Sequence, residues 1–192
     1  MRLGHAAVLV AATMALGACG TAPQGAEPVT AVAEVKAEAE HNDTDVMYLQ
    51  MMIAHHQQGL EMVKLAASDA KRAEIRVLAE AVDATQSDEL TMMKGWLEGW
   101  SAPDTVDHAP SAHADHGGLP ATGPEEIEAL REAKGSAFDT AFLNLFVAHQ
   151  HNAVEMAALE AKGVNKEAKA FAERVKLSRT DQIQQMLQLL NS

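Results

Sequence analysis

An internal repeat is the feature that most constrains the fold of this 192-residue chain. In the first part of the repeat, residues of like type recur at one constant offset: Asp45 with Asp139, Leu49 with Leu143, His55 with His149, Glu61 with Glu155, and Met62 with Met156. In the second part the offset is one residue smaller: Leu78 with Phe171, Val82 with Val175, Asp88 with Asp181, Leu90 with Ile183, Met93 with Met186, and Leu97 with Leu190. Each copy is therefore a hairpin of two segments. A single helical hairpin cannot bury its apolar stripe alone, so the repeat predicts an all-α four-helix bundle with approximate twofold pseudo-symmetry.

Apolar spacing and helix-end signals give the predicted boundaries of the helices. Asn42-Asp43-Thr44-Asp45 is a helix-start cluster, and helical spacing continues to about Ala67. We expect Ser68-Asp69 to cap a second helix, from about Ala70 to Trp100. Pro124 fits the first position of a short helix, which Gly135-Ser136 interrupts. The remaining predicted elements are a helix from about Ala137 to Ala161, a turn over Lys162–Asn165 with Gly163 as C-cap, and a helix from about Lys166 to Leu190. The resulting domain covers 42–192, divided into hairpin 1 (42–100), a linker (101–123) and hairpin 2 (124–192).

The N-terminus predicts export. Residues 1–18 combine Arg2 with a short apolar run that ends in Leu16-Gly17-Ala18-Cys19. This end resembles a bacterial lipobox, which implies cleavage before Cys19 and a lipid on its sulfur. A plain secretory signal with a chance cysteine is the alternative. Residues 19–41 read as a flexible tether. We therefore expect a lipid-anchored protein of the cell envelope that faces the periplasm or the cell exterior.

Charge and motifs exclude several classes of function. The formal net charge is −12, and no basic cluster is present that could neutralise phosphates, so no nucleic-acid partner is expected. We find no Ser/His/Asp grouping, phosphate-binding loop or nucleotide fingerprint. The chain is therefore predicted not to be an enzyme.

Helical phase separates the histidines of the two copies. Successive helical residues lie about 100° apart, so His55 shares a face with Met51 and Met62, with Met52 close by. His56 still falls within the broad apolar arc. In the second copy His149 shares a face with Met156, whereas His151 lies about 200° away, on the polar side. We expect His149 to be the inward partner of His55 and His151 to be solvated.

Two interpretations of these inward residues stay open. The second helix adds Gln86, Glu89 and Met93 on one stripe, and its counterpart carries Arg179, Gln182 and Met186, without a carboxylate. The side chains could bind a metal ion. However, methionine at helical spacing is more often core filler, and a buried histidine is usually hydrogen-bonded. The residue-level candidates for metal ligation are His55, His56, His149, Met51, Met52, Met62, Met93 and Met156.

The linker holds a separate group of histidines. His108, His113 and His116 alternate there with acidic residues. Such a segment could collect metal ions, but a solvated linker is the interpretation we favour.

The pattern from Met52 to Gly59, followed by Met62, by Gln86-Ser87-Asp88-Glu89 and by Met93, resembles the domain-of-unknown-function 305 family. The resemblance covers about Asp45 to Leu190. It implies a ferritin-like four-helix bundle, frequent export and a link to copper. Carried over by position, it implies His55, His56, Met52 and His149 as ligands, with Met62 and Met93 behind them. The chain departs from the family pattern at Gln150, where a second histidine is usual, at Phe146, where a methionine is usual, and in the linker. These departures suggest that one of two pseudo-symmetric half-sites is impaired.

The leading hypothesis is a membrane-tethered, extracytoplasmic protein that binds copper for sequestration, delivery or tolerance. Thioether and imidazole ligands together suit Cu(I), and imidazole suits Cu(II). Zinc in a structural site would normally use thiolates, which are missing. The alternatives are an envelope interaction module without metal, and an uncharacterised metal-dependent oxidoreductase. The expected partners are a metal ion and, through Cys19, a membrane; a homodimer that completes half-sites is also compatible with the sequence.

Overall fold

A computed structural model gives the structure of residues 40–105 and 122–192, and all regular elements in these two ranges are helical. The elements are α1 (Asp43–Asp69), α2 (Ala73–Gly99), α3 (Pro124–Glu132), α4 (Gly135–Leu159), the 3₁₀ turn η2 (Glu160–Lys162) and α5 (Lys166–Leu190). None of the helices in these ranges is long and apolar enough to cross a membrane. The predicted signal peptide, Cys19 and the histidines His108, His113 and His116 lie outside the described residues.

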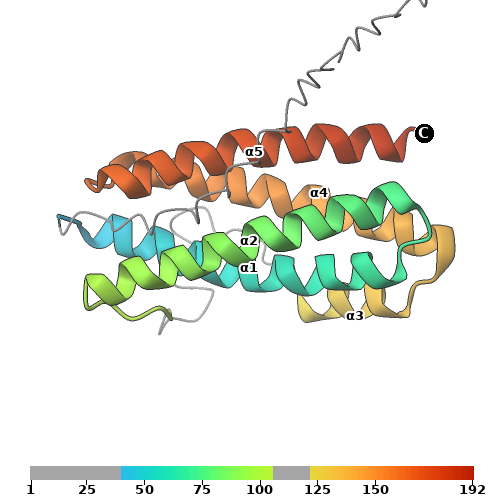
Figure 1. The fold of residues 1–192 in the computed structure, drawn as a ribbon, viewed down its shortest axis with the longest axis horizontal. Coiled ribbons are helices and arrows are strands. Elements are labelled where there is room, and N and C mark those ends of the chain that lie inside the picture. Colours follow the sequence, from blue (N-terminus) through green and yellow to red (C-terminus); the bar gives the residue numbers. More distant parts are fainter. Residues whose placement is uncertain (1–39, 106–121) are drawn as a thin grey trace, which may run out of the picture. The chain divides into compact units, whose positions relative to one another are not determined.

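The four long helices form the predicted pair of hairpins. Helix α1 packs against α2, α4 packs against α5, and α1 and α4 join the two hairpins (Figure 1). The short helix α3 lies beside α1 and α4. The all-α bundle built from a repeated hairpin is thus confirmed.

The two hairpins hold each other through the repeated aspartates, Asp45 and Asp139. Asp139, at the start of α4, accepts hydrogen bonds from the backbone N–H groups of Lys71 (2.7 Å) and Arg72 (3.1 Å), which precede α2. Asp45, at the start of α1, accepts from the N–H groups of Val164 (3.1 Å) and Asn165 (3.0 Å), which precede α5. Each aspartate therefore satisfies the orphan donors at the interhelical turn of the opposite hairpin. We call these contacts the two clasps.

One of the predicted helix caps is wrong, at the start of α2. Helix α1 continues through Asp69, and Ser68 bonds within it, to the Leu65 carbonyl. The N-cap of α2 is Arg72, whose side chain caps nothing. Asp139 binds the N–H groups of Lys71 and of the cap residue Arg72 from across the bundle, so it fixes the turn before α2 and not the first turn of the helix. The helix start at Asn42 is confirmed, because the Asn42 side chain accepts from Thr44 and Asp45, and the Asp45 carboxylate accepts from the Asn42 N–H.

Two glycines at helix ends serve different purposes. Gly135 has φ of +59°, which glycine adopts at little cost, and α4 begins there and not at Ala137. Gly163 has φ of −65°, so it is not a left-handed cap. A Cβ at Gly163 would lie 2.4 Å from both Asp45 Oδ1 and Glu160 Oε1. Glycine is needed at that position because two carboxyl groups approach the backbone.

The core consists of two apolar clusters along the bundle. The Phe142 cluster includes Leu60, Val63, Ile75, Leu78, Val82, Phe138, Phe142, Phe146 and Ile183. The Trp96 cluster includes Tyr48, Leu49, Ile53, Trp96, Leu97, Ala153, Phe171 and Val175. Each long helix contributes residues to both clusters, at different levels along its axis. Between these levels each helix turns polar side chains towards the interior.

Candidate metal site

A layer of polar side chains separates the two apolar clusters. Each long helix contributes two neighbouring positions to it: His55 and His56 from α1, Gln86 and Glu89 from α2, His149 and Gln150 from α4, and Arg179 and Gln182 from α5. Six of these side chains are buried, and those of Glu89 and Gln182 are partly exposed. We call this set the polar layer. The phase of a helix is local, so the sequence could predict which residues turn inward; it could not predict that all four helices turn polar at the same level.

His55 and His149 meet across α1 and α4, as predicted. Their rings stack with centroids 3.6 Å apart and planes 14° apart. His55 Nε2 lies 2.9 Å from the carbonyl oxygen of His149. A carbonyl only accepts, so Nε2 carries the hydrogen and the lone pair of His55 is on Nδ1. His151 is exposed, also as predicted.

His56 belongs to an ion-pair cluster with Glu89 and Arg179. Its Nε2 lies 2.8 Å from Glu89 Oε2, and Nη2 of Arg179 donates to the same oxygen. The guanidinium also lies 3.3 Å from His56 Nε2. The carboxylate accepts, so Nε2 of His56 carries a hydrogen and Nδ1 holds the lone pair. Nδ1 is buried and has no hydrogen-bond partner.

The second hairpin has the equivalent cross-helix bond in neutral form. Gln150 replaces His56, Gln182 replaces Glu89, and the Gln150 amide donates to the Gln182 amide oxygen. The departure from the family pattern at Gln150 is therefore matched by its partner on α5. At the position where the sequence suggested an impaired half-site, the structure has a partly buried amide pair.

Gly59 and Thr122 fix the surroundings of His149. A Cβ at Gly59 would lie 2.6 Å from Gln86 Oε1 and 2.8 Å from His149 Nε2, so both side chains press against the backbone of α1. The Thr122 hydroxyl lies 3.1 Å from His149 Nδ1. Sequence reasoning did not identify Thr122, since nothing in the pattern of the linker brings its last residues to the polar layer.

Burial keeps these imidazoles neutral. Desolvation lowers the pKa of His149 to about 3 and, with the neighbouring histidines, holds the pKa of His55 well below its usual value. The pKa of His56 is lowered by burial too, against the opposing effect of Glu89. For Glu89, burial works to raise the pKa, but the His56 bond and the Arg179 charge outweigh it, so the pKa is lowered and the carboxylate is ionised. At neutral pH each histidine therefore has one ring nitrogen that carries a lone pair.

Several buried polar atoms in this layer have no hydrogen-bond partner. They include His55 Nδ1, His56 Nδ1, His149 Nε2 and both amide atoms of Gln86. Buried polar atoms are nearly always paired, so such a concentration points to a ligand. Within residues 40–105 and 122–192, however, no three His, Cys, Asp or Glu side chains are placed to hold one metal ion. Binding by all three histidines would require at least one ring to rotate.

Comparison with known proteins identifies the family. The family model of the domain of unknown function DUF305 matches residues 45–190. The chain belongs to the DUF305 family. No curated protein matches this DUF305 chain.

Solved structures agree with the fold. A DUF305 protein from Streptomyces coelicolor, described as a presumed secreted protein, is 27% identical with a TM-score of 0.71, covering 77% of this chain and 92% of that one. A DUF305 fragment from Deinococcus radiodurans is 21% identical with a TM-score of 0.69, covering 78% and 97%. CopM in its Cu(II)-bound form is 26% identical with a TM-score of 0.63, covering 77% and 95%. CopM has also been solved in a Cu(I)-bound form.

The candidate methionines of this DUF305 protein pack in the apolar clusters beside the polar layer. Met52, Met93 and Met156 are buried in the Trp96 cluster, and Met51 packs against it half-buried. Met62 lies in the Phe142 cluster together with Met186. The structure therefore gives each of these side chains a packing role, and their role as ligands stays a prediction.

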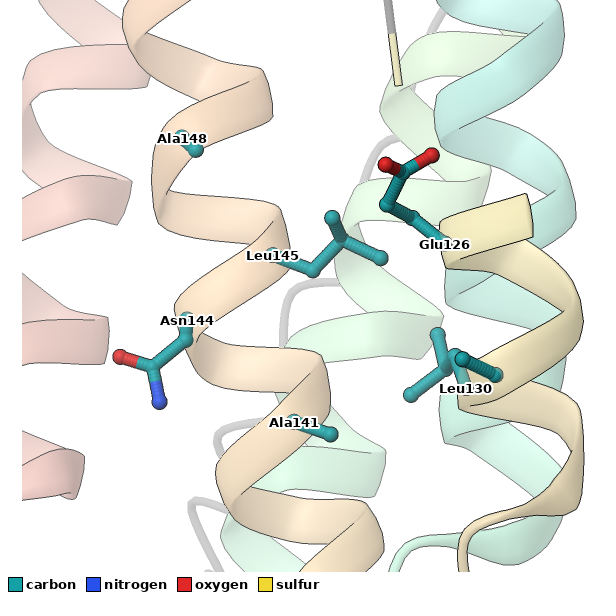
Figure 2. A pocket seen from close by; sticks show the side chains of 7 residues that line it. Glu126, Leu130, Ala141, Asn144, Leu145 and Ala148 are labelled. Atoms are coloured by element: carbon teal, nitrogen blue, oxygen red, sulfur yellow. The ribbon is translucent and has the colours of Figure 1, made fainter. Parts of the chain in front are cut away.

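The DUF305 bundle also has a surface groove between α3 and α4, about 420 Å³ in volume (Figure 2). It is lined by Glu126, Ala129, Leu130, Ala141, Asn144, Leu145 and Ala148. None of these residues belongs to the polar layer. The histidines are thus enclosed between helices, away from this groove.

Proposed function

We propose that this DUF305 protein binds copper in its polar layer and acts outside the cytoplasm in copper sequestration, delivery or tolerance. The observation that carries the proposal is the set of three buried imidazoles, each neutral and each with a ring nitrogen that has no partner. Neutral imidazole is a good ligand for copper ions. Copper is the cargo in this proposal, and no catalytic role is assigned to it.

The histidines are the proposed ligands. His55, His56 and His149 present lone pairs on Nδ1, Nδ1 and Nε2 respectively, provided that Thr122 accepts a hydrogen from His149 Nδ1. Met52 lies one turn before the histidine pair on α1 and is the nearest thioether along the helix. Met51, Met62, Met93 and Met156 are secondary candidates; all five methionines, Met52 included, pack in or against the apolar clusters.

The comparisons support the choice of metal. CopM, which shares the fold, has been solved with Cu(II) and with Cu(I) at 26% and 25% identity. The ligand chemistry gives independent support, because thioether and imidazole favour copper over harder cations.

Export is the second part of the proposal. It rests on the apolar segment within residues 1–18 and on the cysteine at Cys19. A lipid on Cys19 would hold the bundle at a membrane surface of the cell envelope. Mass spectrometry of the protein from its native envelope tests this directly, and a chain that starts before residue 19 without a lipid contradicts it.

Metal titration of the purified protein tests the copper site. We expect about one copper ion per chain, and we expect His55→Ala with His56→Ala to abolish the uptake. His151→Ala is the matched control, because His151 is exposed. Unchanged stoichiometry in a folded double variant would exclude this site. Metal-independent melting without copper uptake would favour an envelope interaction module instead.

A further inference from the structure

Arg179 is an unexpected component of a cation-binding layer. It is fully buried, and it takes the position on α5 that Gln86 holds on α2. Its guanidinium donates to Glu89 Oε2 and lies 3.3 Å from Nε2 of His56. A buried arginine next to a candidate ligand repels an incoming cation, so its effect on binding has to be considered.

The charges of the polar layer cancel before any ion enters. Arg179 is always protonated and is paired with the carboxylate of Glu89, and the other six members of the layer are imidazoles and amides. Glu89 is the only carboxylate of the layer, and Arg179 holds it. An ion bound by the imidazoles thus brings its full charge into the bundle without an anionic ligand to offset it.

The cost of that charge depends steeply on valence. In a medium of low dielectric constant the solvation penalty of an ion grows with the square of its charge. The penalty for a divalent ion is therefore about four times that for a monovalent ion. The repulsion from Arg179 and the attraction to Glu89 both double, so this pair does not offset the extra solvation cost. For a divalent ion Glu89 would have to leave Arg179, and the guanidinium would remain buried without a counter-ion.

We propose that Arg179 is a specificity residue that makes the polar layer select singly charged soft cations, Cu(I) and Ag(I), over doubly charged ones. This inference rests on the proposed copper function and refines it. The second hairpin has an uncharged version of the same cross-helix bond. Gln182 stands at the position that corresponds to Glu89, and its bond to Gln150 involves no charge.

Two variants isolate the charge of Arg179. Arg179→Gln copies the residue at the equivalent position of the repeat, Gln86, and leaves Glu89 free to bind a cation. Arg179→Gln with Glu89→Gln removes both charges and copies the neutral chemistry of Gln150 and Gln182. Circular dichroism and urea unfolding of each variant establish that it is folded.

The test is competitive titration of the full-length protein with Ag(I), a monovalent probe stable in air, and with Zn²⁺ and Cu(II). We expect Arg179→Gln to strengthen divalent binding about tenfold or more relative to Ag(I), since a unit charge within a few ångström acts strongly at a protein dielectric of about 20. The double variant should return to the preference of the wild-type protein. The inference is overturned if Arg179→Gln leaves the divalent affinity relative to Ag(I) unchanged, or if the double variant does not restore the wild-type value.

Glu89→Gln removes the negative charge of the pair in place of the positive one. This variant tests the inference if Arg179→Gln does not fold. It leaves Arg179 uncompensated, so both affinities should fall, and the divalent affinity should fall more. An equal fall for both ions overturns the inference. If the wild-type protein binds Ag(I) but the variants do not change its divalent affinity relative to Ag(I), only the role of Arg179 is contradicted. If the wild-type protein binds none of the three ions, the proposed copper function is contradicted as well.

Discussion

The two hairpins share one architecture and differ in the chemistry at its centre. In the first, His56 bonds to the carboxylate of Glu89, which Arg179 also holds. In the second, Gln150 bonds to Gln182 at the equivalent positions. The cross-helix bond is present in both copies, but only in the first copy does it join an imidazole to a carboxylate. The repeat thus keeps the candidate ligands His55 and His149 in both copies, and the second imidazole, His56, in the first copy alone.

The clasps differ in a related way. Asp45 and Asp139 each bind two backbone N–H groups of the opposite hairpin. The Asp45 clasp has a second carboxyl beside it, that of Glu160, which is buried and whose oxygens have no hydrogen-bond partner of good geometry.

The largest expected effect is the difference in copper affinity between the variants His56→Ala and Gln150→Ala. Loss of His56 should weaken copper binding by about 100-fold or more, since even residues behind a metal ligand contribute 10- to 100-fold. Loss of Gln150 removes a neutral bond and should change the affinity less than about threefold. Competition with a chelator of known affinity measures both. Equal losses would mean that the two half-sites bind metal alike.

Removal of the aspartates should destabilise both hairpins. Asp139→Ala leaves the N–H groups of Lys71 and Arg72 without an acceptor, and Asp45→Ala does the same for Val164 and Asn165. We expect each substitution to lower the free energy of unfolding by about 1–3 kcal/mol. Urea denaturation at pH 7 measures this, and Asp43→Ala, at an exposed position in the same first turn as Asp45, is the control. A loss no larger than the control would show that the turns do not depend on the clasps.

The raised pKa of Glu160, beside the Asp45 clasp, should make the stability of the fold depend on pH. Burial and the adjacent Asp45 raise the pKa of Glu160 from 4.5 to about 9. The folded protein therefore retains a proton that the unfolded chain releases, and its contribution to stability is complete below pH 4.5 and lost as the pH rises towards 9. Asp45 acts in the opposite sense: burial opposes the shift, but the bonds from Glu160 and the backbone lower its pKa, so its contribution is lost in acid.

Glu160→Gln tests that sign. The amide cannot ionise, so the variant should be more stable than the wild-type protein at pH 8 by about 1–3 kcal/mol, and its unfolding free energy should vary less between pH 5 and 9. Urea unfolding across this range is the measurement. Parallel pH profiles for the two proteins would show that Glu160 is not protonated in the folded state.

The smallest effect is expected for His151→Gln. This change copies Gln57, the residue at the equivalent position of the first hairpin, and both side chains are exposed. Stability should stay within about 0.5 kcal/mol, and copper affinity within about twofold. A clear loss of copper binding would show that the solvated histidine takes part in the site after all.

Much of the fold and part of the site were predictable because they depend on local helical geometry. The repeat, the helix-start cluster at Asn42 and the inward phase of His55 and His149 follow from spacing along one helix, and the structure agrees with them. The expected cap at Ser68-Asp69 was wrong, since α1 continues through Asp69 and α2 begins after Arg72, at a turn held by the distant Asp139. Gly163 was correctly placed in a turn, but its reason is the space taken by two carboxyl groups and not a left-handed cap.

The sequence by itself determined that four amphipathic helices pair as a duplicated hairpin, and which histidines face inward, because a helix turns by a fixed angle per residue. Only the tertiary structure decided which side chains meet at one level. The axial register of the helices brings Arg179 into contact with Glu89 and Asp139 into contact with the turn before α2. The segment before α3 brings Thr122 beside His149. That register results from packing the two apolar clusters above and below the polar layer, and no periodicity within a single helix encodes it.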